Sequence, residues 1–199
     1  MDSLLQGGFA DPVLESQTNF RAIMDALANP GTRQELVTPQ SISHTLSPEL
    51  VSILLTLADH DTPVWLDAVL RADTGLADFL AFHSGAPLVE APDKAVFAVA
   101  GGAGQLPAFN RFNLGSQEYP DRSTTIALAV PSLSGGAVLS LRGPGIKDHI
   151  HISPQGLPAD FTAQWSANRE IFPRGVDLLL VADGAVIGLP RSTRIAEGH

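Results

Sequence analysis

The chain has 199 residues, of which 44% are hydrophobic and 17% charged, a composition typical of one globular domain and not of a disordered chain. Its 21 acidic and 12 basic side chains give a net charge of −9, which argues against nucleic-acid binding because an acidic surface repels phosphate groups. The absence of cysteine excludes disulfides, thiol nucleophiles and cysteine-bound zinc or iron–sulfur centres.

Helical patterns dominate the first half of the chain. A first helix is predicted from an apolar stripe with helical spacing, which consists of Phe20, Ile23, Met24 and Leu27 and ends at residues 29–31. Ser47 and Pro48 are typical of the N-cap and first turn of a second helix, whose apolar residues 50–58 indicate deep burial. A short strand over residues 62–66 follows, and Asp73 or Thr74 begins a third helix.

The second half favours strands. They are predicted over residues 95–100, 124–130, 137–142, 146–152, 176–182 and 185–189. Asp183-Gly184 is typical of a tight hairpin turn between the last two of these strands. Two helices are also predicted in this half, a short one around Phe109 and a longer one that begins near Phe161. This order predicts a mixed α/β fold in three layers, with helices on both faces of a sheet. We expect a single domain over residues 1–196 and set residues 197–199 apart as a candidate tag remnant.

Neither a membrane span nor a secretion signal is expected. No run of about 18 apolar residues occurs. The first eight residues lack a basic segment followed by a long apolar one. Together with the lack of cysteine, this favours a cytoplasmic location.

Two carboxylates and an imidazole meet at the corner between the second helix and the first strand, in Asp59-His60-Asp61. They could hold a metal ion, although adjacent residues seldom chelate one ion together. A crowded carboxylate pair could instead act in acid–base chemistry. We favour a structural role, in which Asp61 accepts backbone N–H groups in an Asx-type turn, over contact with a ligand or partner and over catalysis.

Three arginines, Arg142, Arg174 and Arg191, stand where strands or turns begin or end. Guanidinium groups at such points can converge on an anion or on a carboxylate of a partner. They can equally pair with carboxylates within the chain, for which the candidates are Asp59, Asp61 and Asp177. We favour structural or interface pairing.

His149 and His151 would lie on one face of a strand, where two imidazoles can bind a metal. The same alternation turns Ile146, Ile150 and Ile152 inward, so both histidines should face solvent. Because no third ligand is evident, we predict an exposed polar face and no metal site.

Five blocks of the sequence resemble the PhnH family, a subunit of the bacterial carbon–phosphorus lyase core complex. They cover residues 20–31, 54–66, 82–89, 132–146 and 172–193. The most specific block is Leu-Ala-Asp-His-Asp-Thr-Pro-Val-Trp-Leu at residues 57–66, because a chance match of that length is improbable. Residues 101–123 match least.

The resemblance implies a fold like that of pyridoxal-phosphate-dependent transferases, without the cofactor lysine and with no cofactor. It also implies a homodimer that joins the sister subunits PhnG, PhnI and PhnJ in a complex for alkylphosphonate use. The subunit would support the step that couples a phosphonate to the ribose of ATP and displaces adenine. Cleavage of the C–P bond would belong to a different, cysteine-bearing subunit, since this chain has no cysteine to hold a cluster.

We therefore expect a non-catalytic or co-catalytic subunit, without independent activity. Residues expected to contact ligand or partner are Asp59, Asp61, Trp65, Arg142, Arg174, Asp177 and Arg191, with Asp59 and Asp61 as the candidates for catalysis. One alternative is an independent enzyme that uses pyridoxal phosphate or a metal at His149 and His151. A sensor for phosphonates or nucleotides is another.

Overall fold

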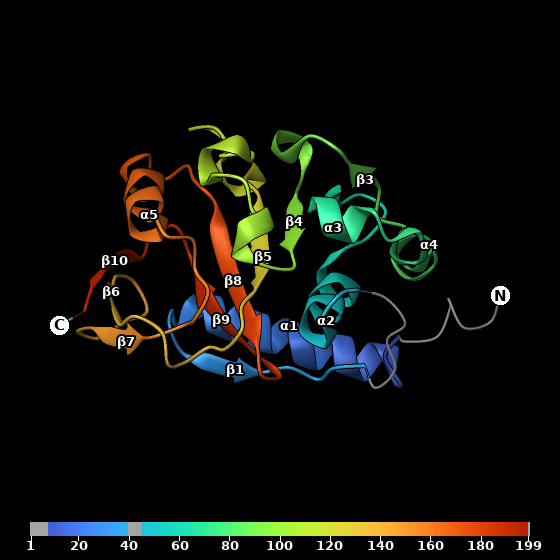
Figure 1. Cartoon of the computed structure of the whole chain (residues 1–199), viewed down its shortest axis with the longest axis horizontal. Coiled ribbons are helices and arrows are strands. Elements are labelled where there is room, and N and C mark those ends of the chain that lie inside the picture. Colours follow the sequence, from blue (N-terminus) through green and yellow to red (C-terminus); the bar gives the residue numbers. More distant parts are fainter. Residues whose placement is uncertain (1–7, 40–44, 199) are drawn as a thin grey trace.

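A seven-stranded β-sheet is central to the computed structural model, which describes residues 8–39 and 45–198. The strands follow the order β1-β9-β8-β5-β4-β2-β3 (Figure 1). Their bounds are β1 (Arg33–Glu35), β2 (Val64–Leu66), β3 (Leu88–Val89), β4 (Phe97–Ala100), β5 (Thr125–Ala129), β8 (Asp177–Ala182) and β9 (Ala185–Leu189). From β8 to β3 the strands are parallel, whereas β9 and β1 are antiparallel to their neighbours. The mixed sheet predicted from the sequence is confirmed.

Helices pack on both faces of this sheet. Within the described residues they are α1 (Pro12–Ala28), α2 (Pro48–Leu57), α3 (Ala68–Arg71), α4 (Thr74–His83) and α5 (Phe161–Glu170). Buried residues of α1 to α4 share one core with Leu179 and Val181 of β8. Leu178 and Leu180 point to the opposite face, where they share the other core with α5. Strand alternation thus separates two cores. None of the helices in the described ranges combines the length and apolarity needed to cross a membrane.

The predicted helix starts are confirmed. The Ser47 side chain accepts a hydrogen bond from Leu50 N at the beginning of α2. Asp73 caps α4 by accepting from two backbone N–H groups of its first turn. Its other oxygen accepts from the backbone N–H and the hydroxyl of Thr45, at 3.0 and 3.2 Å. The bond from the Thr45 N–H is the main cause that lowers the pKa of Asp73. Desolvation of the carboxyl group acts in the opposite direction, and the other hydrogen bonds add to the lowering.

Helix α1 buries only part of the predicted stripe, since Ile23 is buried and Leu27 packs half-buried against the core. Phe20 and Met24 of the predicted stripe are 49% and 41% exposed. The residues that α1 buries are Asn19, Ile23 and Ala26. A Cβ on Gly188 of β9 would lie 2.6 Å from the backbone of Ala26, so the helix approaches the sheet where neither side has a large side chain. The closest contact of the helix with the sheet is thus made by Ala26, while Phe20 and Met24 stay partly exposed.

A second sheet, of order β10-β6-β7, lies at one end of the molecule (Figure 1). It contains β6 (Leu139–Arg142), β7 (Ile150–Ile152) and β10 (Arg194–Glu197). Both strands predicted here form, although Ile146 precedes β7 instead of belonging to it. Glu197, which the sequence analysis set apart with the last residues, pairs with Leu139 as the end of β10.

Residues 101–123 form short 3-10 helices, of which the one at Phe109–Arg111 replaces the short helix predicted there. Phe109 and Phe112 are buried, and the ring of Phe112 meets Trp65 edge-on at 5.5 Å between centroids. The predicted hairpin between β8 and β9 is confirmed, since Asp183 and Gly184 adopt φ values of 55° and 71°. Both values suit a type I′ turn.

Candidate functional site

Asp177 and Arg191 form the ion pair that the sequence left as one of several options. Asp177 begins β8, and because β8 and β9 are antiparallel, the residues that follow β9 return to it. The backbone N–H and the Nε of Arg191 donate to Asp177 Oδ1 at 2.7 and 3.1 Å. Arg191 Nη2 makes a short bond to Asp177 Oδ2. The pair is therefore bidentate, the geometry that suits guanidinium and carboxylate best.

The same guanidinium also holds two neighbouring loops. Arg191 Nη1 donates to the carbonyl oxygen of Pro120 at 2.6 Å and to that of Pro173 at 3.5 Å. The side chains of Arg191 and Asp177 are only 15% and 18% exposed. They line a shallow surface depression of about 320 Å³. With its donors directed at protein acceptors, Arg191 acts as a clamp between loops and offers little to a phosphate or phosphonate.

The Asp59-His60-Asp61 corner is exposed and forms an Asx-type turn. The acceptor is Asp59, whose Oδ1 receives the backbone N–H of Asp61 at 2.9 Å, so the assignment of that role to Asp61 was wrong. Thr62 closes the turn through its hydroxyl, which donates to Asp59 O at 2.9 Å. Asp61 lies 3.3 Å from His60 Nε2, with both side chains about four-fifths exposed (82% and 78%). This geometry supports the structural interpretation.

The remaining candidates lie apart from one another. Trp65 is 4% exposed and belongs to the core. Arg142 is exposed on β6 of the small sheet. Arg174 follows α5; its backbone N–H donates to Ile171 O, and its Nε is buried without a hydrogen-bond partner among the described residues.

Among the seven candidates, the structure joins Asp177 with Arg191 and Asp59 with Asp61. Arg174 directly follows Pro173, whose carbonyl Arg191 binds. Trp65 and Arg142 lie elsewhere. The Asp59–Asp61 turn precedes β2, which is three positions from β8 in the sheet. At about 4.8 Å per strand this separates the two sites by about 14 Å. The predicted candidates therefore do not converge on one pocket.

His149 and His151 both face solvent, as predicted, with ring centroids 5.0 Å apart. No group of three or more histidines and carboxylates gathers at a metal-binding distance anywhere in residues 8–39 and 45–198. Both lysines are exposed: Lys94 lies 3.6 Å from the carboxylate of Asp93, and Lys147 lies in the loop before β7.

Sequence reasoning missed Asp67, a carboxylate that is 1% exposed at the end of β2. Its Oδ1 accepts from the N–H groups of Val69 and Leu70, and its Oδ2 accepts from Gly101 N at 2.7 Å. After β2 the chain continues to one face of the sheet, and after the neighbouring strand β4 it continues to the other face. Strand ends that diverge in this way often form a binding crevice. Backbone donors already occupy both oxygens, so Asp67 ties the two strands together. The sequence did offer one signal for this role, because aspartate is a preferred N-cap residue and Asp67 directly precedes α3.

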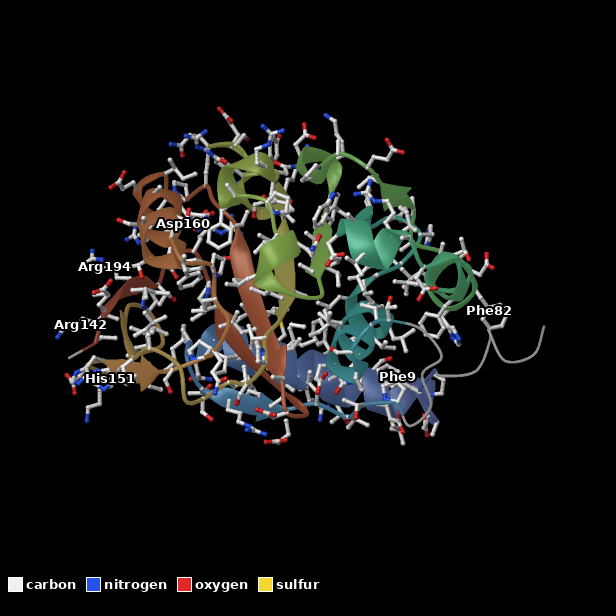
Figure 2. The ribbon with its side chains drawn as sticks, in the orientation of Figure 1. Phe9, Phe82, Arg142, His151, Asp160 and Arg194 are labelled. Carbon is white, nitrogen blue, oxygen red and sulfur yellow. The ribbon has the colours of Figure 1, made fainter. Side chains whose placement is uncertain are left out.

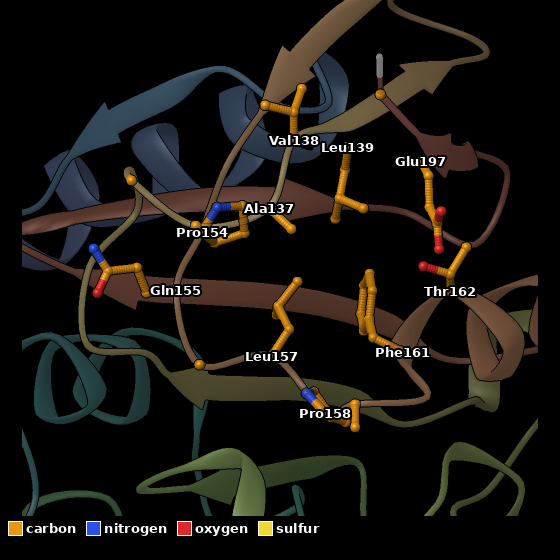
Figure 3. A pocket seen from close by; sticks show the side chains of 15 residues that line it. Ala137, Val138, Leu139, Pro154, Gln155, Leu157, Pro158, Phe161, Thr162 and Glu197 are labelled. Atoms are coloured by element: carbon orange, nitrogen blue, oxygen red, sulfur yellow. The ribbon is translucent and has the colours of Figure 1, made fainter.

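A groove of about 640 Å³ opens between the small sheet and the start of α5 (Figure 3). Figure 3 shows Leu139 facing Leu157 and Phe161 across it, with Glu197 beside Thr162. The glycine-rich turn at residues 135–136 forms part of its wall, which the sequence indicated only as a turn. Glu197 is the one ionisable side chain in this lining, so the groove offers surface for contact but no acid–base pair.

Comparison with known proteins shows which family the chain resembles in sequence. The model of the family "Bacterial phosphonate metabolism protein (PhnH)" matches residues 7–196. A protein of Rhizobium meliloti (strain 1021), "Alpha-D-ribose 1-methylphosphonate 5-triphosphate synthase subunit PhnH", is 46% identical over 192 residues, which cover 96% of each chain. The "Putative C-P lyase subunit protein HtxG" of Stutzerimonas stutzeri is 33% identical over 179 residues, 90% of this chain and 85% of that one. The chain belongs to the PhnH family.

Proposed function

We propose that the chain is a subunit of the carbon–phosphorus lyase complex in alkylphosphonate catabolism. In this role it supports the formation of ribose 1-alkylphosphonate 5-triphosphate from ATP and phosphonate, without independent activity. The observation that carries the proposal is the 46% identity over 96% of both chains to a protein named as a synthase subunit. The candidate residues agree with it, because Arg191 and Asp177 satisfy each other within the fold and the largest described groove holds a single ionisable side chain, Glu197.

We also propose that the fold resembles that of pyridoxal-phosphate-dependent transferases, although the chain does not use their cofactor. A mostly parallel sheet with an antiparallel strand at β9 supports the likeness. A Schiff-base lysine needs a pocket that lowers its pKa or shields it from water. Lys94 is 72% exposed, and Lys147 lies in an exposed loop. The lysines of this chain therefore do not fit pyridoxal phosphate, which supports a role without that cofactor.

The proposed setting is the cytoplasm, where the chain joins PhnG, PhnI and PhnJ and forms a homodimer when alone. An exposed apolar stripe on α1 supports a role in assembly, since Val13, Phe20 and Met24 are 65%, 49% and 41% exposed. Apolar residues that cluster on a surface are typical of association sites.

Genetic complementation and co-purification test the proposal. A bacterial strain that lacks its own subunit of this family should regain growth on methylphosphonate as sole phosphorus source when it expresses this chain. Growth on inorganic phosphate is the control. The tagged chain, co-expressed with PhnG, PhnI and PhnJ, should elute with them from a sizing column. Failure of both assays would refute the proposal.

Each alternative function, an independent enzyme or a sensor, predicts a signal that can be measured on the purified chain. An independent pyridoxal enzyme would show the absorbance of lysine-bound pyridoxal phosphate on titration of the purified chain. A metal enzyme would retain about one ion per chain after dialysis. A sensor would release or absorb heat with ATP or methylphosphonate in the calorimeter. We expect none of these signals from the chain alone.

A further inference from the structure

The outer face of the small sheet gathers basic side chains on an acidic protein. Alternation along β6 and β10 turns Leu139, Leu141 and Ile195 toward the core and leaves Arg142 and Arg194 exposed on the other side. His149 and His151 of the neighbouring segment are exposed as well. Figure 2 shows Arg142, His151 and Arg194 at the same end of the molecule, where they project outward. We call these four residues the basic face.

The register places two like charges directly opposite each other. Arg194 of the edge strand β10 pairs with Arg142 of β6, so the two residues are direct cross-strand neighbours on this face. His151 of β7 pairs with Ser140 in the same way. Two like charges at directly opposed positions destabilise an antiparallel pair.

Neither arginine is neutralised within the described part of the chain. Over that part, the ion pairs and hydrogen bonds join no carboxylate to Arg142 or Arg194. Glu170 lines the shallow groove beside Arg194 without pairing to it. Glu197 lies on the other side of the sheet, in the groove with Thr162. The chain has 21 acidic side chains for 12 basic ones, so an unpaired arginine pair is not explained by a shortage of carboxylates.

We propose that the basic face docks on an acidic surface of another protein subunit of the complex, an inference that rests on the proposed function. The charges are complementary, and guanidinium groups bind carboxylates in two-point contacts. A sheet face is flat and matches an extended protein surface. A nucleic acid fits less well, because the rest of the chain, at a net charge of −9, repels a long polyanion.

The test compares two pairs of charge reversals that change the net charge equally. R142E/R194E reverses the basic face. R71E/R111E reverses two exposed arginines on α3 and on the 3-10 helix at Phe109–Arg111, away from the small sheet and from the apolar stripe of α1. Affinity for the co-expressed PhnG–PhnI–PhnJ assembly is measured by biolayer interferometry at about 0.05 M and about 0.5 M salt. Circular dichroism checks that every variant is folded.

We expect R142E/R194E to weaken binding about tenfold or more at the lower salt concentration and R71E/R111E to change it less than about threefold. R142K/R194K keeps the charge but cannot form two-point contacts, so it should bind more weakly than the unmodified chain and more tightly than R142E/R194E. Binding of the unmodified chain should weaken as salt rises. Equal losses in both reversal pairs, or no loss in either, would overturn the inference while leaving the proposed function intact.

Two further outcomes also decide the question. If the unmodified chain does not bind the assembly at all, the proposed function fails and the inference falls with it. If instead the unmodified chain binds a fluorescent DNA duplex at about 0.15 M salt and R142E/R194E abolishes that binding, the face serves a nucleic acid. That result would overturn the assignment to a protein partner.

Discussion

The Asp177–Arg191 pair gives the sharpest prediction about stability. Replacing Asp177 with alanine removes the acceptor of three bonds and leaves the guanidinium of Arg191 mostly buried, at 15% exposure. Breaking a fully buried pair costs about 3–5 kcal/mol. Because this pair is partly exposed, we expect a loss of about 3 kcal/mol in the free energy of unfolding. For a chain of this size that corresponds to a fall of about 6–12 °C in Tm.

The matched control is another carboxylate with an ion-pair partner, Asp61, which is 82% exposed beside His60. Its replacement by alanine should change stability by less than about 0.5 kcal/mol. Urea denaturation of both variants measures the difference. In a double-mutant cycle, D177A and R191A should show a coupling energy, since each removes the same contact. If D177A costs no more than D61A, Arg191 does not clamp the loops and its guanidinium is free for a ligand.

Three further variants test other features of the fold. Gly188→Ala places a Cβ 2.6 Å from the α1 backbone and should cost about 1–3 kcal/mol in urea denaturation, whereas Gly104→Ala, which meets nothing within 4 Å, should not. Asp73→Ala removes a helix cap and should cost about 1 kcal/mol at pH 7. Because the folded pKa of Asp73 is lowered, that contribution is present above 3.8 and disappears as pH falls through the lower pKa, so the two unfolding curves should converge in acid. Arg142→Glu alone puts a carboxylate opposite Arg194, so the isolated chain should keep its stability or gain about 0.2–1 kcal/mol in urea denaturation. A loss above about 1 kcal/mol would contradict the register argument.

The elements predictable from sequence were those whose own residues decide their structure. Ser47 and Asp73 begin helices because their side chains satisfy free backbone N–H groups nearby. Asp183-Gly184 turns because both positions tolerate positive φ. The short strands β1, β3 and β10 and the one-turn helix α3 were missed. Their stability comes from neighbours distant in sequence, as when β1 pairs with β9, and two to four residues carry no periodic signal.

Helix α1 shows why periodicity predicts a buried face only in part, because Ile23 and Leu27 of its stripe pack inward and Phe20 and Met24 do not. A pattern of large apolar residues predicts which face is buried only if the packing surface leaves room for them. Gly188 and Ala26 bring two backbones close together instead, and Asn19 is buried because its amide bonds to both backbone groups of Val37. For the charged residues at strand ends, the sequence left several pairings open, because which ends meet depends on the strand order. The antiparallel pairing of β8 with β9 brings Asp177 to Arg191 and leaves Asp59 and Asp61 three strands away.

The surroundings of the arginines divide them into two kinds. Arg191 is enclosed by a carboxylate and two carbonyl oxygens, so its charge is already compensated and serves the fold. Arg142 and Arg194 face each other with no acceptor in the described chain, which raises the free energy of the isolated chain. A charge that the fold leaves uncompensated can be compensated by another molecule, at no cost of breaking an internal pair. The basic face is therefore the part of the surface where binding an acidic partner relieves a repulsion and forms new bonds at once.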